Sequence, residues 1–69
     1  MNKSIIAEGN YCKRSYFTVN GTAEFTIGVC DMGEDECRIE YSDGLYKLIK
    51  NNQLICAATQ VLIHVVNKC

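Results

Sequence analysis

Apolar residues recur at every second position along much of the chain, which is the pattern of half-buried β-strands. From 23 to 29 the alternate positions hold Ala, Phe, Ile and Val, and residues 37–42 repeat this period. The pattern, together with the turn signals between the runs, predicts strands at 3–8, 11–19, 22–30, 37–42, 45–50 and 53–57.

Short turn sequences separate the predicted strands. The Asn-Gly pair at 20–21 tolerates the positive φ angles of a two-residue hairpin turn, and the Asn-Asn pair at 51–52 predicts another. Ser-Asp-Gly at 42–44 suits a three-residue turn with glycine in the left-handed region, Gly-Asn at 9–10 a bend, and 31–36 a longer hairpin loop. These turns predict sequential antiparallel hairpins.

The segment from 57 to 69 fits two structures. Its β-branched residues Val61, Ile63 and Val65 would line one face of a strand. Read as a helix, its polar and apolar residues also separate onto two sides. We predict a strand, with a short helix packed on the sheet as the alternative.

The predicted fold is mainly β, a single domain over residues 1–69. One flat sheet in so short a chain would leave its apolar face in water. We therefore expect a small antiparallel meander of five to six strands, curled into an open barrel or a strongly bent sheet.

Composition and charge narrow the function classes. The net charge of −1 supplies neither the cationic field that attracts phosphates nor the strong anionic field of a nucleic-acid mimic. The apolar run before Glu8 has three residues, Ile5 to Ala7, too few for a signal-peptide core, and no apolar run is long enough to span a membrane. We expect a cytoplasmic chain without a membrane partner.

We expect the five cysteines to be reduced thiols, because the cytoplasm keeps cysteine reduced. Cys30 and Cys37 flank the loop 31–36, but the alternation puts them on opposite faces, so no bond between them is expected. None of the cysteines forms a Cys-x-x-Cys pair, and His64 is the single histidine. We predict no metal site and no cofactor.

The stretch 11–17, Tyr-Cys-Lys-Arg-Ser-Tyr-Phe, combines cations with aromatic residues. A two-residue turn at 20–21 would set Arg14 opposite Ile27 on the core side, with Lys13 on the other side. The cations and aromatics would then be divided between faces, whereas a base-stacking surface needs them together. A strand is the preferred interpretation. A nucleic-acid-binding β-barrel stays as the alternative, through Lys13, Arg14, Lys47 and Lys50.

The densest charge lies in the loop 31–36, which is either a solvated hairpin tip or a protrusion that docks into a basic groove of a partner. No cysteine has a neighbouring histidine, and no phosphate-binding loop occurs, so we predict that the chain is not an enzyme.

We predict a stoichiometric protein-binding module, such as an inhibitor or adaptor of a larger protein. Phages and mobile elements often encode chains of this kind, which is an association and not a deduction. Homodimerisation through an edge strand is a further option. The predicted contact residues are Asp31, Glu34, Asp35, Glu36, Tyr11, Phe17 and Tyr46.

Overall fold

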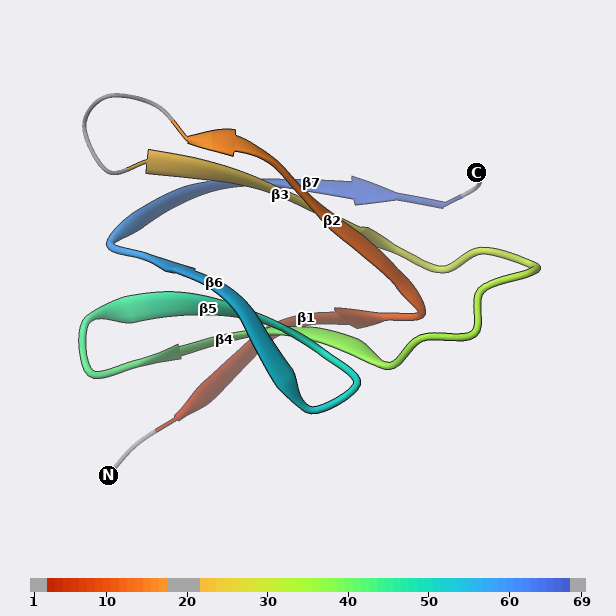
Figure 1. Ribbon diagram of the computed structural model, residues 1–69, viewed down its shortest axis with the longest axis horizontal. Helices are drawn as coiled ribbons and strands as arrows, with labels where there is room; N and C mark the ends of the chain where they lie inside the picture. Colours follow the sequence, from red (N-terminus) through yellow and green to blue (C-terminus); the bar gives the residue numbers. More distant parts are fainter. Residues whose placement is uncertain (1–2, 18–21, 68–69) are drawn as a thin grey trace.

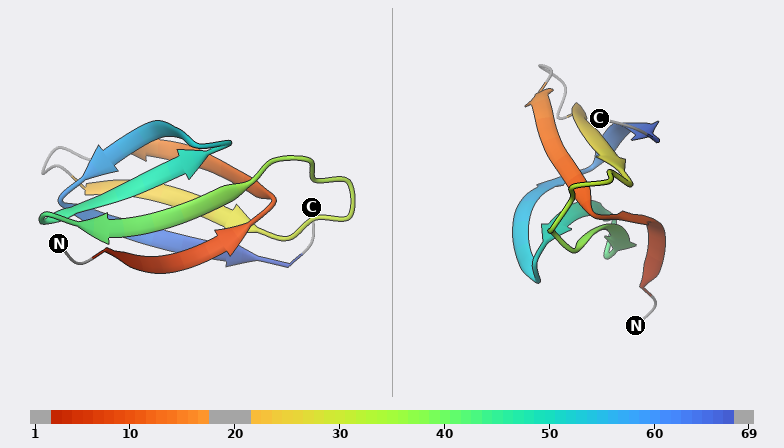
Figure 2. Two further views of the ribbon diagram at one scale, coloured as in Figure 1. Left: turned by 90° about the horizontal axis from the view of Figure 1, so that it is seen from below. Right: turned by 90° about the vertical axis from the view of Figure 1, so that its right-hand side faces the viewer.

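Seven strands form two sheets that lie face to face (Figure 1). The computed structural model describes residues 3–17 and 22–67, and the side chains of these residues except 15–17. Figure 2 shows the two layers from the side. The strands are β1 (Ser4–Gly9), β2 (Tyr11–Phe17), β3 (Thr22–Gly28), β4 (Cys37–Ser42), β5 (Leu45–Lys50), β6 (Gln53–Ala58) and β7 (Gln60–Val66).

The mainly-β prediction is confirmed, and the C-terminal segment is a strand, so the helix alternative is wrong. The predicted single meander is also wrong. One sheet has the order β1-β4-β5-β6 and the other β2-β3-β7, with β7 parallel to β3. The chain passes from one sheet to the other at Asn10, between β1 and β2, over residues 29–36, between β3 and β4, and at Thr59, between β6 and β7.

The hydrophobic core lies between the sheets. Phe25 and Ile27 of β3 and Ile39 of β4 are fully buried, because the sheets cover each other's apolar faces. Leu48 of β5 is fully buried as well, and Tyr46 packs against the core. Both side chains therefore lie on the inner face of β5.

Two hairpin turns are visible in full. The Asn51-Asn52 turn is confirmed, with φ of 54° and 66° at its two residues. The other turn has two residues instead of the predicted three, because Ser42 pairs with Leu45. Its residues Asp43 and Gly44 have φ of 55° and 79°, the left-handed values that match the twist of the flanking strands. The predicted turn at 20–21 lies outside the described residues.

The pairing of β2 with β3 differs from the prediction by two residues. Cys12 lies opposite Ile27, and Arg14 lies opposite Phe25. The register shifts by one residue between Arg14 and Phe17, a bulge that the sequence pattern does not reveal and that accounts for one residue of this difference. An even displacement leaves the side of each residue before the bulge unchanged, so Lys13, opposite Thr26, still lies on the outer face.

Candidate protein-binding site

The acidic residues lie in a connection between the two sheets, residues 29–36, which we call the acidic connection. It extends past the strands at the end of the molecule where β1 passes into β2 (Figure 1). The strands that it joins, β3 and β4, belong to different sheets. The predicted hairpin tip at 31–36 is therefore wrong, and the segment is a crossing between layers.

Asn10 binds the first half of the acidic connection. Its amide nitrogen Nδ2 donates to the carbonyl oxygen of Cys30 at 3.0 Å, and its Oδ1 accepts from the Cys30 backbone N–H at 2.7 Å. The Asn10 backbone N–H donates to the carbonyl oxygen of Gly28 at 2.9 Å. A Cβ on Gly33 would lie 2.5 Å from the Asn10 side chain, so the close approach requires glycine at that position. One side chain thus fixes the path of the chain beyond β3.

The turn between β5 and β6 binds the second half. Asn51 Oδ1 accepts from the Glu36 backbone N–H at 2.8 Å, and the Asn51 backbone N–H donates to the Glu36 carbonyl oxygen at 2.7 Å. Asp35 accepts from Asn51 Nδ2 at 3.1 Å and lies 3.6 Å from the Lys50 ammonium group. Asp35 is therefore engaged within the chain, whereas the side chains of Asp31, Glu34 and Glu36 are exposed.

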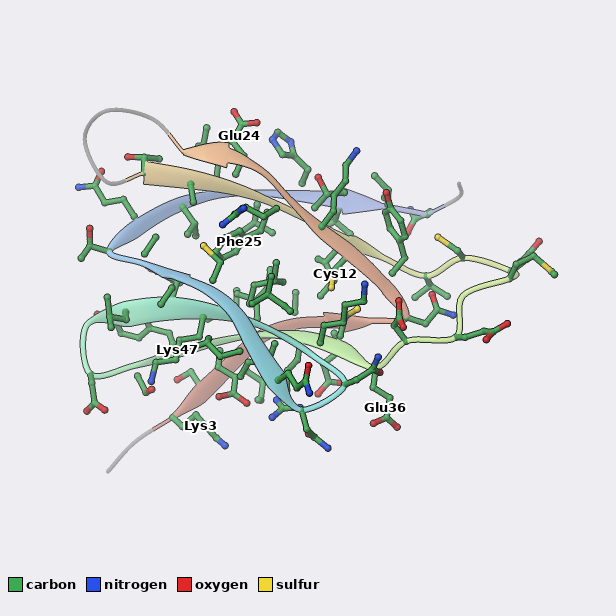
Figure 3. All side chains as sticks on the ribbon, viewed as in Figure 1. Lys3, Cys12, Glu24, Phe25, Glu36 and Lys47 are labelled. Atoms are coloured by element: carbon green, nitrogen blue, oxygen red, sulfur yellow. The ribbon has the colours of Figure 1, made fainter. Side chains whose placement is uncertain are left out.

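A pocket of about 310 Å³ lies at the base of the acidic connection. Glu8 and Glu36 are the acidic residues of its lining; the side chains of both are exposed, and Figure 3 shows Glu36 pointing away from the sheets. Arg38 is the one basic residue of the lining, and its guanidinium group is bound to Glu40 and Asn52. The charged side chains of the lining residues are thus two acidic groups and one basic group. Its lining consists of Glu8, Gly9, Glu36, Cys37 and Arg38.

Arg38 is held by two acceptors outside the pocket lining. Its Nε donates to Glu40 Oε2, and its NH1 donates to Asn52 Oδ1 at 3.1 Å. Glu40 is buried and also lies 3.7 Å from the Lys3 ammonium group. The hydrogen bond from Arg38, with a smaller contribution from Lys3, holds the pKa of Glu40 below its usual value although burial acts in the opposite direction.

The aromatic residues predicted at the site are not all brought together. Tyr11 pairs with Gly28 and lies at the same end as the acidic connection. Tyr46 lies near the other end, where its ring packs against Tyr41 with 4.6 Å between the centroids. The side chain of Phe17 lies outside the described residues. Tyr46 is therefore not part of the surface around the pocket.

The four cations of the nucleic-acid alternative lie on different sheets. Lys13 and Arg14 belong to β2, whereas Lys47 and Lys50 belong to β5. Lys50 pairs with Asp35, and Lys47 donates to Ser42 Oγ at 3.2 Å. Lys13 and Lys47 occupy the outer faces of opposite sheets, so these cations do not form one phosphate-binding surface.

The histidine has an acidic neighbour that the sequence did not reveal. The parallel pairing of β3 with β7 sets His64 opposite Thr26, and His64 Nε2 lies 3.7 Å from Glu24 Oε1. His64 is exposed and this contact is on the outer face. Among residues 3–17 and 22–67, no group of three or more histidine, cysteine and acidic side chains is arranged to hold a metal ion.

The prediction of free thiols holds for three cysteines and is wrong for one. Cys12, Cys37 and Cys56 are free and buried. Cys30 is disulfide-bonded, so the expectation of a fully reduced chain is incorrect at that residue. Cys30 and Cys37 are not bonded to each other, as expected, because Cys37 is free, although the hairpin on which that expectation was based is not present.

The fold and this site define a small two-sheet β-sandwich whose sheets are joined by a fixed acidic connection. The chain matches no known family model, and comparisons with curated proteins and with solved structures found no significant match. Within the part of the chain that the structure describes, no helix has the length and apolarity needed to cross a membrane.

Proposed function

We propose that this chain is a non-catalytic, stoichiometric protein-binding module, such as an inhibitor or adaptor of a larger protein. Its contact surface is the acidic connection together with the adjoining pocket, and its partner presents a basic segment. The observation that carries the proposal is the fixation of the acidic connection at both halves, beside a pocket whose lining residues include Glu8 and Glu36.

Fixation matters because a flexible loop loses conformational freedom on binding, which weakens affinity. Here Asn10 holds one half of the connection and Asn51 the other, each through bonds to main-chain atoms. The exposed carboxylates of Asp31, Glu34 and Glu36 are thus presented on an ordered backbone. Such charge accelerates association with a basic surface and disfavours acidic partners.

The pocket supports recognition of one cationic side chain. Two glutamates are among its lining residues, and the guanidinium group of Arg38 is bound to Glu40 and Asn52. A lysine or arginine of a partner that entered the pocket would meet the exposed Glu8 and Glu36, with which it would form charge-assisted hydrogen bonds. The acidic residues outside the pocket would guide the partner toward it.

The test combines partner capture with charge variants. A pull-down from the native host with mass-spectrometric identification supplies the partner, and binding rates are then measured for Glu34→Gln, Glu36→Gln and the double variant. Asp43→Asn is the matched control, because it removes one exposed carboxylate at the β4–β5 turn and asparagine tolerates the positive φ there. We expect slower association and a weaker salt dependence for the first three variants. Unchanged association of the double variant would refute the proposal.

A further inference from the structure

Two free thiols meet between the sheets. Cys12 of β2 is 6% exposed, Cys37 of β4 is 4% exposed, and both belong to the same buried cluster. Besides burial, the Cys37 side chain contributes to the raised pKa of the Cys12 thiol through a side-chain hydrogen bond, so the two thiols are neighbours within this cluster. Figure 3 shows the Cys12 side chain pointing into the space between the sheets.

The backbone explains why these cysteines meet. Gly9, the last residue of β1, is the register partner of Cys37. The chain then crosses to the second sheet at Asn10, and Cys12 faces inward opposite Ile27. The contact therefore spans from the first sheet to the second, immediately after the crossing.

We propose that Cys12 and Cys37 are a reversible dithiol–disulfide pair, which a low-molecular-weight disulfide oxidises to a covalent bond between the two sheets. The inference goes beyond the proposed binding function and does not depend on it, because it concerns core side chains and not the exposed carboxylates. Its chemical partner is any small disulfide that fits the pocket beside Cys37.

The pocket sets the order of the reaction. Cys37 is among its lining residues and Cys12 is not, so we assign the first contact with a small disulfide to Cys37. The Cys37 thiolate attacks one sulfur of the reagent, forms a mixed disulfide and releases one thiolate. Cys12 then loses its proton to solvent and attacks the Cys37 sulfur, which displaces the second thiolate. In total, two protein thiols are oxidised and one small disulfide is reduced to two thiols.

The second step is the slow one at neutral pH. Burial, and then the hydrogen bond to Cys37, raise the pKa of the Cys12 thiol to about 12, so its thiolate is scarce. Because the thiolate is the attacking species, the rate of bond closure should increase about tenfold for each unit by which the pH rises toward that pKa. The mixed disulfide at Cys37 should accumulate transiently at low pH.

Cys56 provides a matched internal control. It is 6% exposed, as Cys12 is, and belongs to the same core cluster, but it does not line the pocket. The protein, purified without reductant, is incubated with oxidised glutathione, quenched with acid, unfolded, alkylated and mapped by mass spectrometry. We expect a peptide pair linked through Cys12 and Cys37, an increased urea midpoint, and full alkylation of Cys56.

Two variants test the order of the steps. Cys12→Ala should trap a stable glutathione adduct at Cys37, and Cys37→Ala should leave Cys12 without an adduct. The wild-type cross-link tests the proposal even if a variant fails to fold. Alkylation of both Cys12 and Cys37 after prolonged incubation would overturn the proposal, and so would oxidation of Cys56 at the same rate.

Discussion

Replacement of Asn10 by alanine should destabilise the protein through the acidic connection. The substitution removes two hydrogen bonds to Cys30, each of which contributes about 1 kcal/mol. It also leaves the backbone N–H of Cys30, a residue that is 7% exposed, without that acceptor, which adds a desolvation cost of similar size. We expect a loss of about 2–3 kcal/mol, roughly half the stability of a small domain.

Urea denaturation followed by circular dichroism measures this loss. For a chain of this size the dependence on urea is about 1 kcal/mol per molar, so the midpoint should fall by about 2–3 M. The melting temperature should fall by roughly 10–20 °C. Asn10→Asp is the conservative comparison, because it keeps the acceptor for the Cys30 N–H and loses the donor to the Cys30 carbonyl. Its loss should be smaller.

A double-mutant cycle with Gly33 separates this mechanism from a general loss of stability. Gly33→Ala alone should be destabilising, because the added Cβ would lie 2.5 Å from the Asn10 side chain. In the Asn10→Ala background that obstruction is gone, so the double variant should lose less stability than the sum of the losses in the two single variants. Strict additivity, or a change below about 0.5 kcal/mol for Asn10→Ala, would refute the reasoning.

Three further predictions concern pH and one turn. The raised pKa of Cys12, about 12 against an ordinary 9.0, means that the folded state favours the protonated thiol, so stability is complete below pH 9.0 and is lost above it. Above pH 9.0 the free energy of unfolding should fall by about 1.4 kcal/mol per pH unit, and urea titrations of Cys12→Ala should not show this fall. The same dependence on pH in the wild type and in Cys12→Ala would contradict the prediction. The lowered pKa of Glu40, caused mainly by Arg38, predicts stability that is complete above 4.5 and is lost as pH falls below it. Thermal melts of Glu40→Gln should show a weaker acid dependence than wild type, and an unchanged one would count against the ion pair. Gly44 has φ of 79° and open space around it, so Gly44→Ala should lower the stability by about 1 kcal/mol and Gly44→Asn by less. Urea midpoints measure both losses, and equal losses would exclude a backbone origin.

The strands could be predicted because their signals are local. Residues 37–42 and 45–50 have the predicted bounds, and the intervening turn carries residues suited to positive φ. The division into two sheets could not be predicted in this way. The β1–β4 and β3–β7 pairings join segments that are distant in sequence, and alternation within a strand does not select its partner.

The same distinction applies to the candidate site. Glu36 is conspicuous in the sequence because its neighbours are also acidic, whereas Glu8 reaches the pocket only through the pairing of β1 with β4, where it lies opposite Arg38. Asn10 and Asn51 were recognised as turn residues, and asparagine at a turn is a weak signal for a side chain that binds distant backbone. Their partners lie 20 and 15 residues away.

The crossing from β1 to β2 gives the described features a common origin. Gly9 pairs with Cys37 at the pocket, Asn10 binds the acidic connection at Cys30, and Cys12 contacts Cys37 in the core. Because these contacts share one short segment, oxidation of the thiol pair would restrain the same backbone that supports the pocket. The β4–β5 turn belongs to the first sheet alone and lies near the other end, so Gly44→Ala should lower stability without changing association with the partner. A parallel loss of association in that variant would mean that the surface around the pocket responds to overall stability and not to the crossing.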